Sequence, residues 1–165
     1  MLAFGKMGQA ERIKTVALIC TLAILALIIT FKTFGLSGTL TDSEPWGLYR
    51  ISYGSLAPGR MVQLRLLTKH IAGIPGDTVR VTAEGSFING KLWPWSAIPP
   101  HTPYRPLPYG SYKLAPGQFW LLGSNPMSWD SRYLGPIPFD MIQSTIEPWW
   151  TVSNGYALGS RPWSR

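Results

Sequence analysis

The chain has 165 residues, with 15 Lys and Arg against 8 Asp and Glu. This length allows one domain with short appendages, and the scattered positive residues favour a protein that works near anionic lipid over a dedicated nucleic-acid arm. Cys20 is the single cysteine, and His70 and His101 are the two histidines, so the sequence excludes an intrachain disulfide and a cysteine-based zinc site and predicts neither a metal nor a cofactor.

An uncharged apolar segment, TVALICTLAILALIITF, lies between Lys14 and Lys32. As a helix it would extend roughly 25 Å, enough to cross a bilayer if the flanking lysines reach the headgroups. A cleaved signal peptide is the main alternative, and a buried soluble helix is the other. The segment exceeds a usual signal core and no clear small-x-small cleavage site follows it, so we predict a retained anchor over residues 15–34 that includes Cys20.

Positive charge precedes this segment. Lys6, Arg12 and Lys14 are opposed only by Glu11, and the positive-inside rule then predicts that residues 1–14 are cytoplasmic. Residues 35–165 would form a periplasmic domain. The sequence therefore predicts a single-pass protein of the inner membrane.

The rest of the chain has the composition of a β protein. It is rich in Pro (15 residues) and Gly (17 residues), and after residue 40 short alternating runs are divided by turn dipeptides. We predict one strand over Met61–Leu67, another from Val79 to Val81, and a core strand over Phe119–Leu122.

Ser43 opens the motif SEPWGLY. The proline and glycine enforce a turn, which would present the serine hydroxyl from the end of a strand. The alternative is an ordinary turn serine.

Lys69 opens the motif KHIAGIPGD and lies at the end of the first predicted strand, among apolar residues. A buried lysine loses the solvation of its ammonium, its pKa falls, and the neutral amine can take a proton from a serine. The alternative is a surface lysine at a strand end.

Asp130 and Arg132 lie in the third motif, GSNPMSWDSRYLGPIP. Only one residue separates them, so on an extended chain they would share a face and join a charged network. The alternatives are a surface ion pair of little energetic value and, for Ser128 and Ser131, loop hydroxyls without a role.

In this order, the three motifs resemble the boxes of bacterial type I signal peptidases over residues 40–139. KHIAGIPGD is similar to the lysine box K-R-x-x-G-x-P-G-D, and the third motif is similar to G-D-N-x-x-x-S-x-D-S-R-Y-x-G-x-V. SEPWGLY departs from the usual S-M-x-P-T-L and is closer to S-x-P-x-G-x-Y of the TraF-type conjugative-transfer peptidases, which mature pilin subunits. The resemblance implies a mainly β, antiparallel coiled-sheet domain behind a single transmembrane helix.

The resemblance implies Ser43 as the nucleophile and Lys69 as the general base of a serine endopeptidase. It also implies five supporting residues. These are Ser128, which orients the lysine amine; Asp130 and Arg132, which brace the site; Gly123, which lets the backbone approach; and Thr41, whose hydroxyl would help the Ser43 N–H form the oxyanion hole. The sequence departs from the family at Ser124, usually aspartate, and at His70, commonly arginine, which puts the local bracing in question.

Residues 85–116 would form a small insertion rich in proline and aromatic residues. Packing of Trp93, Trp95 and Tyr104 onto the sheet is the preferred interpretation, with substrate contact and a membrane-facing aromatic belt as alternatives. Trp149, Trp150 and Trp163 near the end of the chain have the same alternatives.

We predict that the protein matures a pilin subunit by cleaving its leader peptide. Some members of the conjugative branch also cyclise the pilin. The expected partners are a preprotein or propilin, the lipid bilayer and the conjugative transfer machinery, without nucleic acid. A general type I signal peptidase is the nearest alternative. A catalytically silent pilus or secretion-channel scaffold, and a membrane-anchored DNA-binding factor, are alternatives from other classes.

Overall fold

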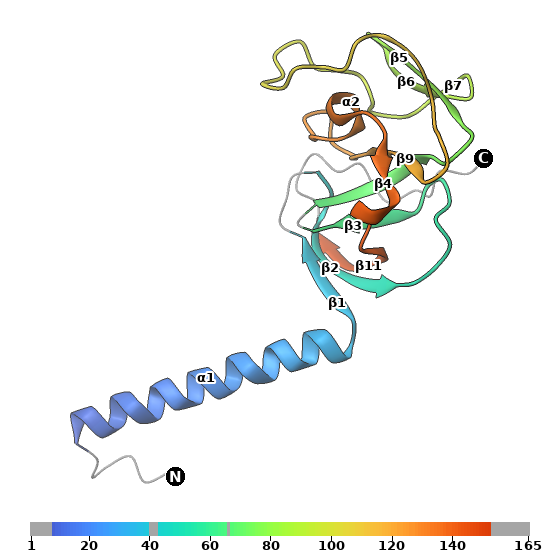
Figure 1. The fold of residues 1–165 in the computed structure, drawn as a ribbon. Coiled ribbons are helices and arrows are strands. Elements are labelled where there is room, and N and C mark those ends of the chain that lie inside the picture. Colours follow the sequence, from blue (N-terminus) through green and yellow to red (C-terminus); the bar gives the residue numbers. More distant parts are fainter. Residues whose placement is uncertain (1–7, 40–42, 66, 153–165) are drawn as a thin grey trace. The chain divides into compact units, whose positions relative to one another are not determined.

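The structure is a computed structural model, and it describes residues 8–39, 43–65 and 67–152 (Figure 1). The chain divides into two compact units, one up to Leu36 and one from Ser37 onward. The first unit contains helix α1 (Gln9–Thr33), which has no buried residue.

Helix α1 is the one helix in the described part of the chain that is long and apolar enough to cross a membrane. Threonine hydroxyls of this helix are hydrogen-bonded within the helix. The hydroxyls of Thr15, Thr21 and Thr30 each donate to the carbonyl four residues earlier, at 2.8 to 2.9 Å. These bonds satisfy the hydroxyls without water, as a helix in lipid requires.

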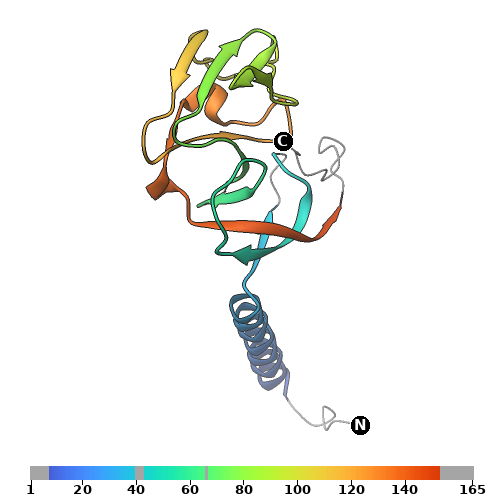
Figure 2. The ribbon, with the colours of Figure 1, turned by 90° about the vertical axis from the view of Figure 1, so that its right-hand side faces the viewer.

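The second unit is built on two sheets (Figures 1 and 2). The larger sheet has seven strands in the order β1-β2-β11-β3-β4-β9-β10. Their bounds are β1 (Leu36–Thr39), β2 (Trp46–Ser52), β11 (Ser144–Val152), β3 (Met61–Leu64), β4 (Leu67–Gly73), β9 (Gln118–Leu122) and β10 (Ile137–Pro138). From β2 to β10 every neighbouring pair is antiparallel, so the prediction of a mainly antiparallel β domain is confirmed.

The smaller sheet has four antiparallel strands in the order β7-β6-β5-β8. They are β5 (Thr78–Thr82), β6 (Gly85–Ile88), β7 (Lys91–Leu92) and β8 (Gly110–Lys113). Asn89 and Gly90 join β6 to β7, both at positive φ, as a two-residue hairpin turn requires. Three of these strands come from residues 85–116.

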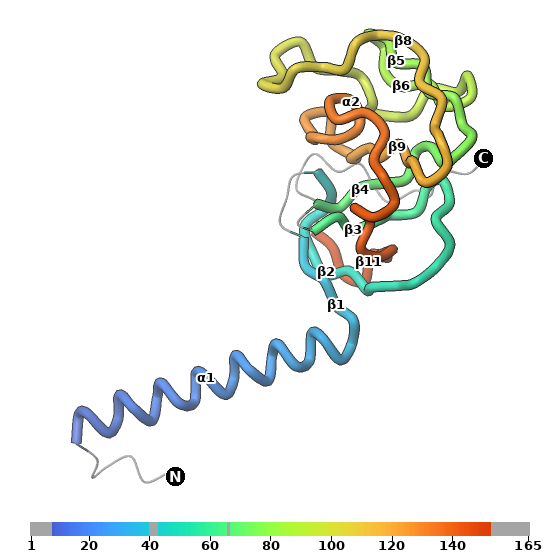
Figure 3. Tube along the Cα trace, in the orientation of Figure 1, coloured from blue at the N-terminus to red at the C-terminus, as the bar shows by residue number. Residues whose placement is uncertain are grey.

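A long segment without regular structure connects β7 to β8, and in Figure 3 it loops out near α2 (Ser131–Leu134). The backbone N–H of Leu107 in this segment donates to the carbonyl of Arg132 at 2.9 Å. A single-turn helix, η2 (Phe139–Met141), follows β10.

Strands β4 and β9 separate two hydrophobic cores. One core contains residues from both sheets, namely Ala72, Val79, Val81, Ile88, Trp93, Leu114, Trp120 and Leu122. The other contains Val62, Ile71, Phe119, Leu121 and Ile137. Alternate residues of β4 and β9 thus face opposite cores, and this explains why Phe119–Leu122 is a continuous apolar run. The predicted core strand there is confirmed by β9.

The predicted single strand over Met61–Leu67 is wrong. The segment contains the whole of β3 and the first residue of β4, with a turn after Leu64 in which Arg65 has a φ of 26°. An alternating apolar pattern continues through this turn, and the turn residues are not the Gly, Asn or Pro that would mark it. Lys69 consequently lies inside β4 rather than at the end of a strand.

Gly47 explains the glycine of SEPWGLY. Strand β11 has a bulge between Pro148 and Trp150 where it pairs with β2. A Cβ at position 47 would lie 2.7 Å from the Cα of Thr151 and still closer to the carbonyl of Trp150. Only glycine therefore lets β11 approach β2 at this point.

Replacement of Gly47 by Ala should lower the free energy of unfolding by about 2 to 3 kcal/mol, because backbone and not a flexible side chain meets the new methyl group. Gly38→Ala is the matched control, since a Cβ there would meet only the carbonyl of Gly47 at 3.9 Å. Urea unfolding of the full chain in detergent checks both variants. Equal midpoints for the two would contradict the close approach of β11.

Candidate active site

Ser43 lies in the turn that leads into β2, and residues on both sides hold this turn. The hydroxyl of Tyr49 donates to the carbonyl of Pro45 at 2.5 Å. The carbonyl of Ser43 accepts from the N–H of Ser124 at 3.1 Å and from Ser124 Oγ at 3.0 Å. The tyrosine of S-x-P-x-G-x-Y therefore fixes the turn, and the loop after β9 fixes Ser43 itself.

Lys69 is positioned by the middle of the large sheet. Strand β4 pairs with β3 on one side and β9 on the other, and Lys69 lies opposite Val62. The residue is 1% exposed. A lysine on a strand with two partners has a fixed Cα, so its amine reaches a defined point.

The amine of Lys69 meets two serine hydroxyls. Lys69 Nζ donates to Ser43 Oγ at 2.6 Å and to Ser128 Oγ at 2.9 Å, and Ser128 Oγ donates to Ser43 Oγ at 3.2 Å. Three residues from three separate motifs thus form one cluster. A base within about 2.6 to 3.2 Å of a hydroxyl meets the geometric requirement for proton abstraction.

Burial lowers the pKa of Lys69 from 10.5 to about 8. The carboxylates of Asp130 and Glu44 oppose this change, and the guanidinium of Arg132 adds to it. Desolvation dominates because an ammonium loses far more hydration energy in an apolar interior than a neutral amine does. A substantial share of the protein therefore holds a neutral amine at mildly alkaline pH.

The loop after β9 brings Ser128 to the cluster. Ser128 N–H donates to the carbonyl of Asn125 at 2.9 Å, and Met127 N–H donates to Asn125 Oδ1 at 2.8 Å. A Cβ at Gly123 would lie 2.6 Å from the Cβ of Ser128. Because position 123 is a glycine, the side chain of Ser128 can approach Lys69.

Asp130 and Arg132 form a buried pair, not the surface ion pair that the sequence left open. Arg132 Nη2 donates to Asp130 Oδ2 at 2.8 Å and Nε donates to Oδ1 at 2.9 Å, and both side chains are completely buried. The extended geometry expected between them is wrong, because Asp130 caps helix α2 by accepting from the N–H of Arg132 at 3.1 Å. Asp130 Oδ2 also accepts from the N–H of Gly123 at 2.9 Å.

The guanidinium of Arg132 also organises the backbone around the cluster. It donates to the carbonyls of Trp95, Ala97, Asn125, Pro126 and Ser128, at 2.8 to 3.3 Å. Arg132 thus joins the segment after β7 to the loop that holds Ser128. Such planar, multiple donation is available to arginine and not to lysine.

Sequence reasoning did not single out Glu44, the residue after Ser43. Its carboxylate is buried and accepts from Ser124 Oγ and His70 Nε2. Ser124 and His70 are the two positions at which the motifs depart from the family pattern. The signal was present in the sequence, because those two departures occur together with a carboxylate directly after Ser43.

The remaining predicted residues are placed as follows. Thr41 and Trp163 lie outside the described residues. Ser131 Oγ accepts from the N–H of Leu121 at 2.9 Å, which gives it a structural contact. Trp93 is buried in the core between the sheets, whereas Trp95 is exposed.

Other aromatic side chains reach the surface. The ring of Tyr104 packs against those of Trp129 and Tyr133, with centroids 6.2 and 5.2 Å apart. Trp149 and Trp150 are 57% and 60% exposed. Trp149 lies at the bulge of β11, and neither tryptophan belongs to a hydrophobic core.

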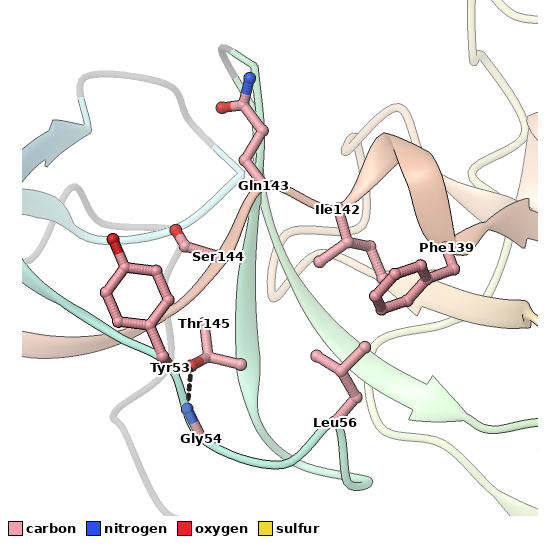
Figure 4. Close-up of a pocket in the computed structure, with 8 residues that line it drawn as sticks. All are labelled: Tyr53, Gly54, Leu56, Phe139, Ile142, Gln143, Ser144 and Thr145. Carbon is pink, nitrogen blue, oxygen red and sulfur yellow. Dashed lines mark hydrogen bonds between the residues drawn. The ribbon is translucent and has the colours of Figure 1, made fainter.

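A pocket of about 190 Å³ has a lining that includes none of Ser43, Lys69 and Ser128 (Figure 4). It is lined by Tyr53, Gly54, Leu56, Phe139, Ile142, Gln143, Ser144 and Thr145. These residues gather where β2 ends, whereas Ser43 precedes its start. None of them is a predicted site residue, and we assign the pocket no part in the chemistry.

The cluster is suited to acyl transfer, in which a serine oxygen attacks a carbonyl and a neutral amine takes its proton. Within the three described segments, His, Cys, Asp and Glu side chains form no group of three or more that could hold a metal ion.

The chain is similar to signal peptidases and to a plasmid transfer protein. The family model described as signal peptidase, peptidase S26, matches residues 9–150. A probable signal peptidase I-2 from Synechocystis sp. is 38% identical over 75 residues, which cover 45% of this chain and 33% of that protein. A plasmid transfer protein TraF from Escherichia coli is 33% identical over 116 residues, which cover 67% of this chain and 62% of that protein.

The chain thus spans less than two thirds of the length of either relative. A crystal structure of a signal peptidase I from Enterococcus faecalis V583 matches with a TM-score of 0.41 and 19% identity, over 57% of this chain and 98% of that chain. The family model alone covers most of the chain, from α1 to β11. The chain therefore belongs to the signal peptidase family, peptidase S26.

Proposed function

We propose that the chain is a membrane-anchored serine endopeptidase that removes leader peptides, with Ser43 as its nucleophile and Lys69 as its general base. One observation carries the proposal, namely the contact of 2.6 Å between Ser43 Oγ and the amine of a buried lysine. A catalytically silent scaffold would gain nothing from this arrangement, because a buried amine costs stability.

In the first step, neutral Lys69 takes the Ser43 proton while Ser43 Oγ bonds to the substrate carbonyl carbon. The tetrahedral intermediate collapses as the peptide C–N bond breaks, and protonated Lys69 gives its proton to the leaving amine. Ser128 Oγ holds the lysine amine throughout. The product of this half-reaction is an ester between Ser43 and the substrate.

The second half-reaction releases Ser43. A water molecule, deprotonated by Lys69, hydrolyses the ester to a carboxylic acid. In a cyclising enzyme the substrate's own terminal amine attacks instead, so that a new peptide bond forms as the ester bond breaks. Both routes return the proton to Ser43.

We propose a pilin precursor of a conjugative system as the substrate. The motif SEPWGLY and the similarity to a relative named plasmid transfer protein TraF support this choice. A general preprotein is the alternative, supported by the relative named probable signal peptidase I-2. Co-expression with a propilin separates them, because cyclisation yields a product one water lighter than the linear chain.

We further propose residues 15–34 as a transmembrane anchor, residues 1–14 as cytoplasmic and residues 35–165 as a periplasmic domain with an insertion near 85–116. Helix α1 supports the anchor by length and composition. Anchoring would hold the dyad near the membrane surface, where leader peptides emerge.

Ser43→Ala and Lys69→Arg should each slow acylation by a serine-directed penem probe by roughly 10³-fold or more, and combining them should add little, because the residues act as a unit. Lys69→Arg fails because a guanidinium stays protonated.

In the wild type the acylation rate should rise with pH through about 8, as Lys69 loses its proton. Mass spectrometry of the Ser43 peptide measures the rate, and Lys91→Arg, at an exposed lysine, is the control. An active Lys69→Arg enzyme would rule out lysine as the base.

Lys69→Met should remove activity yet raise the free energy of unfolding at pH 7 by about 1 to 3 kcal/mol, because it abolishes the cost of burying an ammonium. The pKa of Lys69 is lower in the folded state, so the unfolded state binds more protons between about pH 8 and 10.5. Wild-type stability should therefore rise with pH in this window, and that slope should vanish in Lys69→Met. Urea unfolding tests this, with Lys91→Met as the control. A Lys69→Met protein of lower stability would contradict the buried ammonium.

Protease added to spheroplasts of a Gram-negative host should degrade the domain from residue 35 onward, because the charge before the span predicts a periplasmic location. A cytoplasmic marker protein should remain intact in the same sample. Protection of the domain until lysis would reverse the proposed orientation.

A further inference from the structure

The carboxylate of Glu44, the residue directly after Ser43, is almost completely buried, at 1% exposure. It accepts from Ser124 N–H at 3.2 Å through Oε1, and from Ser124 Oγ at 2.8 Å and His70 Nε2 at 3.1 Å through Oε2. A carboxylate that is buried without such donors would be strongly unfavourable. The site thus contains an acidic group that its acyl-transfer chemistry does not use.

The partners of Glu44 are neighbours of the dyad. His70 follows Lys69 on β4, and Ser124 shares its N–H and its single hydroxyl proton between the carbonyl of Ser43 and the carboxylate of Glu44. Glu44 itself follows Ser43. The hydrogen bonds of Glu44 therefore tie the segment that carries the serine to the strand that carries the lysine and to the loop after β9.

The group is not a second Ser-His-Glu triad. A triad needs a bond from the serine hydroxyl to the imidazole, whereas here Ser124 Oγ and His70 Nε2 both contact the same oxygen of Glu44. The hydrogen bonds that its carboxylate accepts come from Ser124 and His70, two residues of the protein. The contacts of Glu44 are those of a residue that holds neighbouring segments in place.

Among the described residues, Glu44 influences the titration of His70, Lys69 and Tyr49. Burial alone would lower the pKa of His70, but the Glu44 charge and the hydrogen bonds that His70 donates to Glu44 and to the carbonyl of Gly59 outweigh burial and raise it. Burial and then the Glu44 charge raise the pKa of Tyr49. The same charge favours the protonated form of Lys69 and so opposes its role as a base.

We propose that Glu44 is a positioning residue that, through His70 and Ser124, holds Ser43 Oγ within reach of Lys69. The inference rests on the proposed Ser43–Lys69 function. Glu44 has two opposite effects on the reaction. Its hydrogen bonds fix the nucleophile, while its charge moves the protonation of Lys69 to higher pH.

Glu44→Gln separates these two effects. Gln keeps the shape of the side chain, but its amide cannot accept from all three donors at once, and it carries no charge. We expect the maximal acylation rate of Ser43 by the penem probe to fall roughly tenfold to hundredfold, with the probe's KI unchanged. The pH midpoint of the remaining activity should move down, because the charge that stabilised the ammonium of Lys69 is gone. Loss of stability alone would lower the rate without moving the midpoint.

A carboxylate placed at position 124 instead of position 44 should restore part of the acylation rate. Ser124 Oγ is 2.8 Å from Glu44 Oε2, so an aspartate at 124 would carry its charge into the space that Glu44 fills. Ser124→Asp alone should be harmful, because two carboxylates would then meet. In the Glu44→Ala background the same substitution should raise the acylation rate at least several-fold. Glu84→Gln is the matched control, at a glutamate outside the cluster whose side chain contacts Thr82.

Each outcome has one meaning. A wild type that the probe does not acylate overturns the proposed function. A wild type that is acylated, with Glu44→Gln equal to it in maximal rate and pH midpoint, overturns the inference alone. If Glu44→Gln does not fold, Ser124→Ala and His70→Gln replace it, and a maximal rate equal to the wild type in both overturns the inference.

Discussion

The structure of the site depends on the burial of one ammonium group. Lys69 can act as a base only where water is excluded, and water is excluded because β4 lies between β3 and β9 in the middle of the large sheet. A lysine on an edge strand would remain hydrated and protonated at neutral pH. The other groups of the site are therefore arranged around a fixed point in the sheet, and the serine is brought to the lysine by turns and loops.

Two charged systems surround that amine. Asp130 and Glu44 both favour its protonated form, and Arg132 opposes them. Each carboxylate is paired, Asp130 with Arg132 and Glu44 with His70. Pairing limits the field that reaches Lys69, so that desolvation remains the dominant influence. The site thus combines tight hydrogen bonding of backbone segments with a lysine that still loses its proton near pH 8.

The residues of the cluster could be predicted from the sequence because each lies in a short motif with its own turn chemistry. Ser43 and Lys69 are candidates from their own motifs, whereas the role of Ser128 follows only from the family resemblance, and the structure brings the polar atoms of all three together. The turn at Arg65 could not be predicted, because its residues lack a turn signature. The complete burial of Arg132 could not be predicted either, because it depends on carbonyls from segments far apart in the chain, among them that of Trp95. Glu44 was missed because a carboxylate in a turn is ordinarily exposed.

The hydrogen bonds of Arg132 have a consequence for cooperativity. One guanidinium donates hydrogen bonds to carbonyls on the segment after β7 and on the loop that carries Ser128. If either segment opens, carbonyl partners of a fully buried cation are lost, and the other segment loses its support. The two segments therefore form a single unit of local unfolding, with backbone amides that exchange with solvent in the same opening event. Proteolysis or insertion within residues 95–97 would thus disturb Ser128, although some thirty residues of chain separate them.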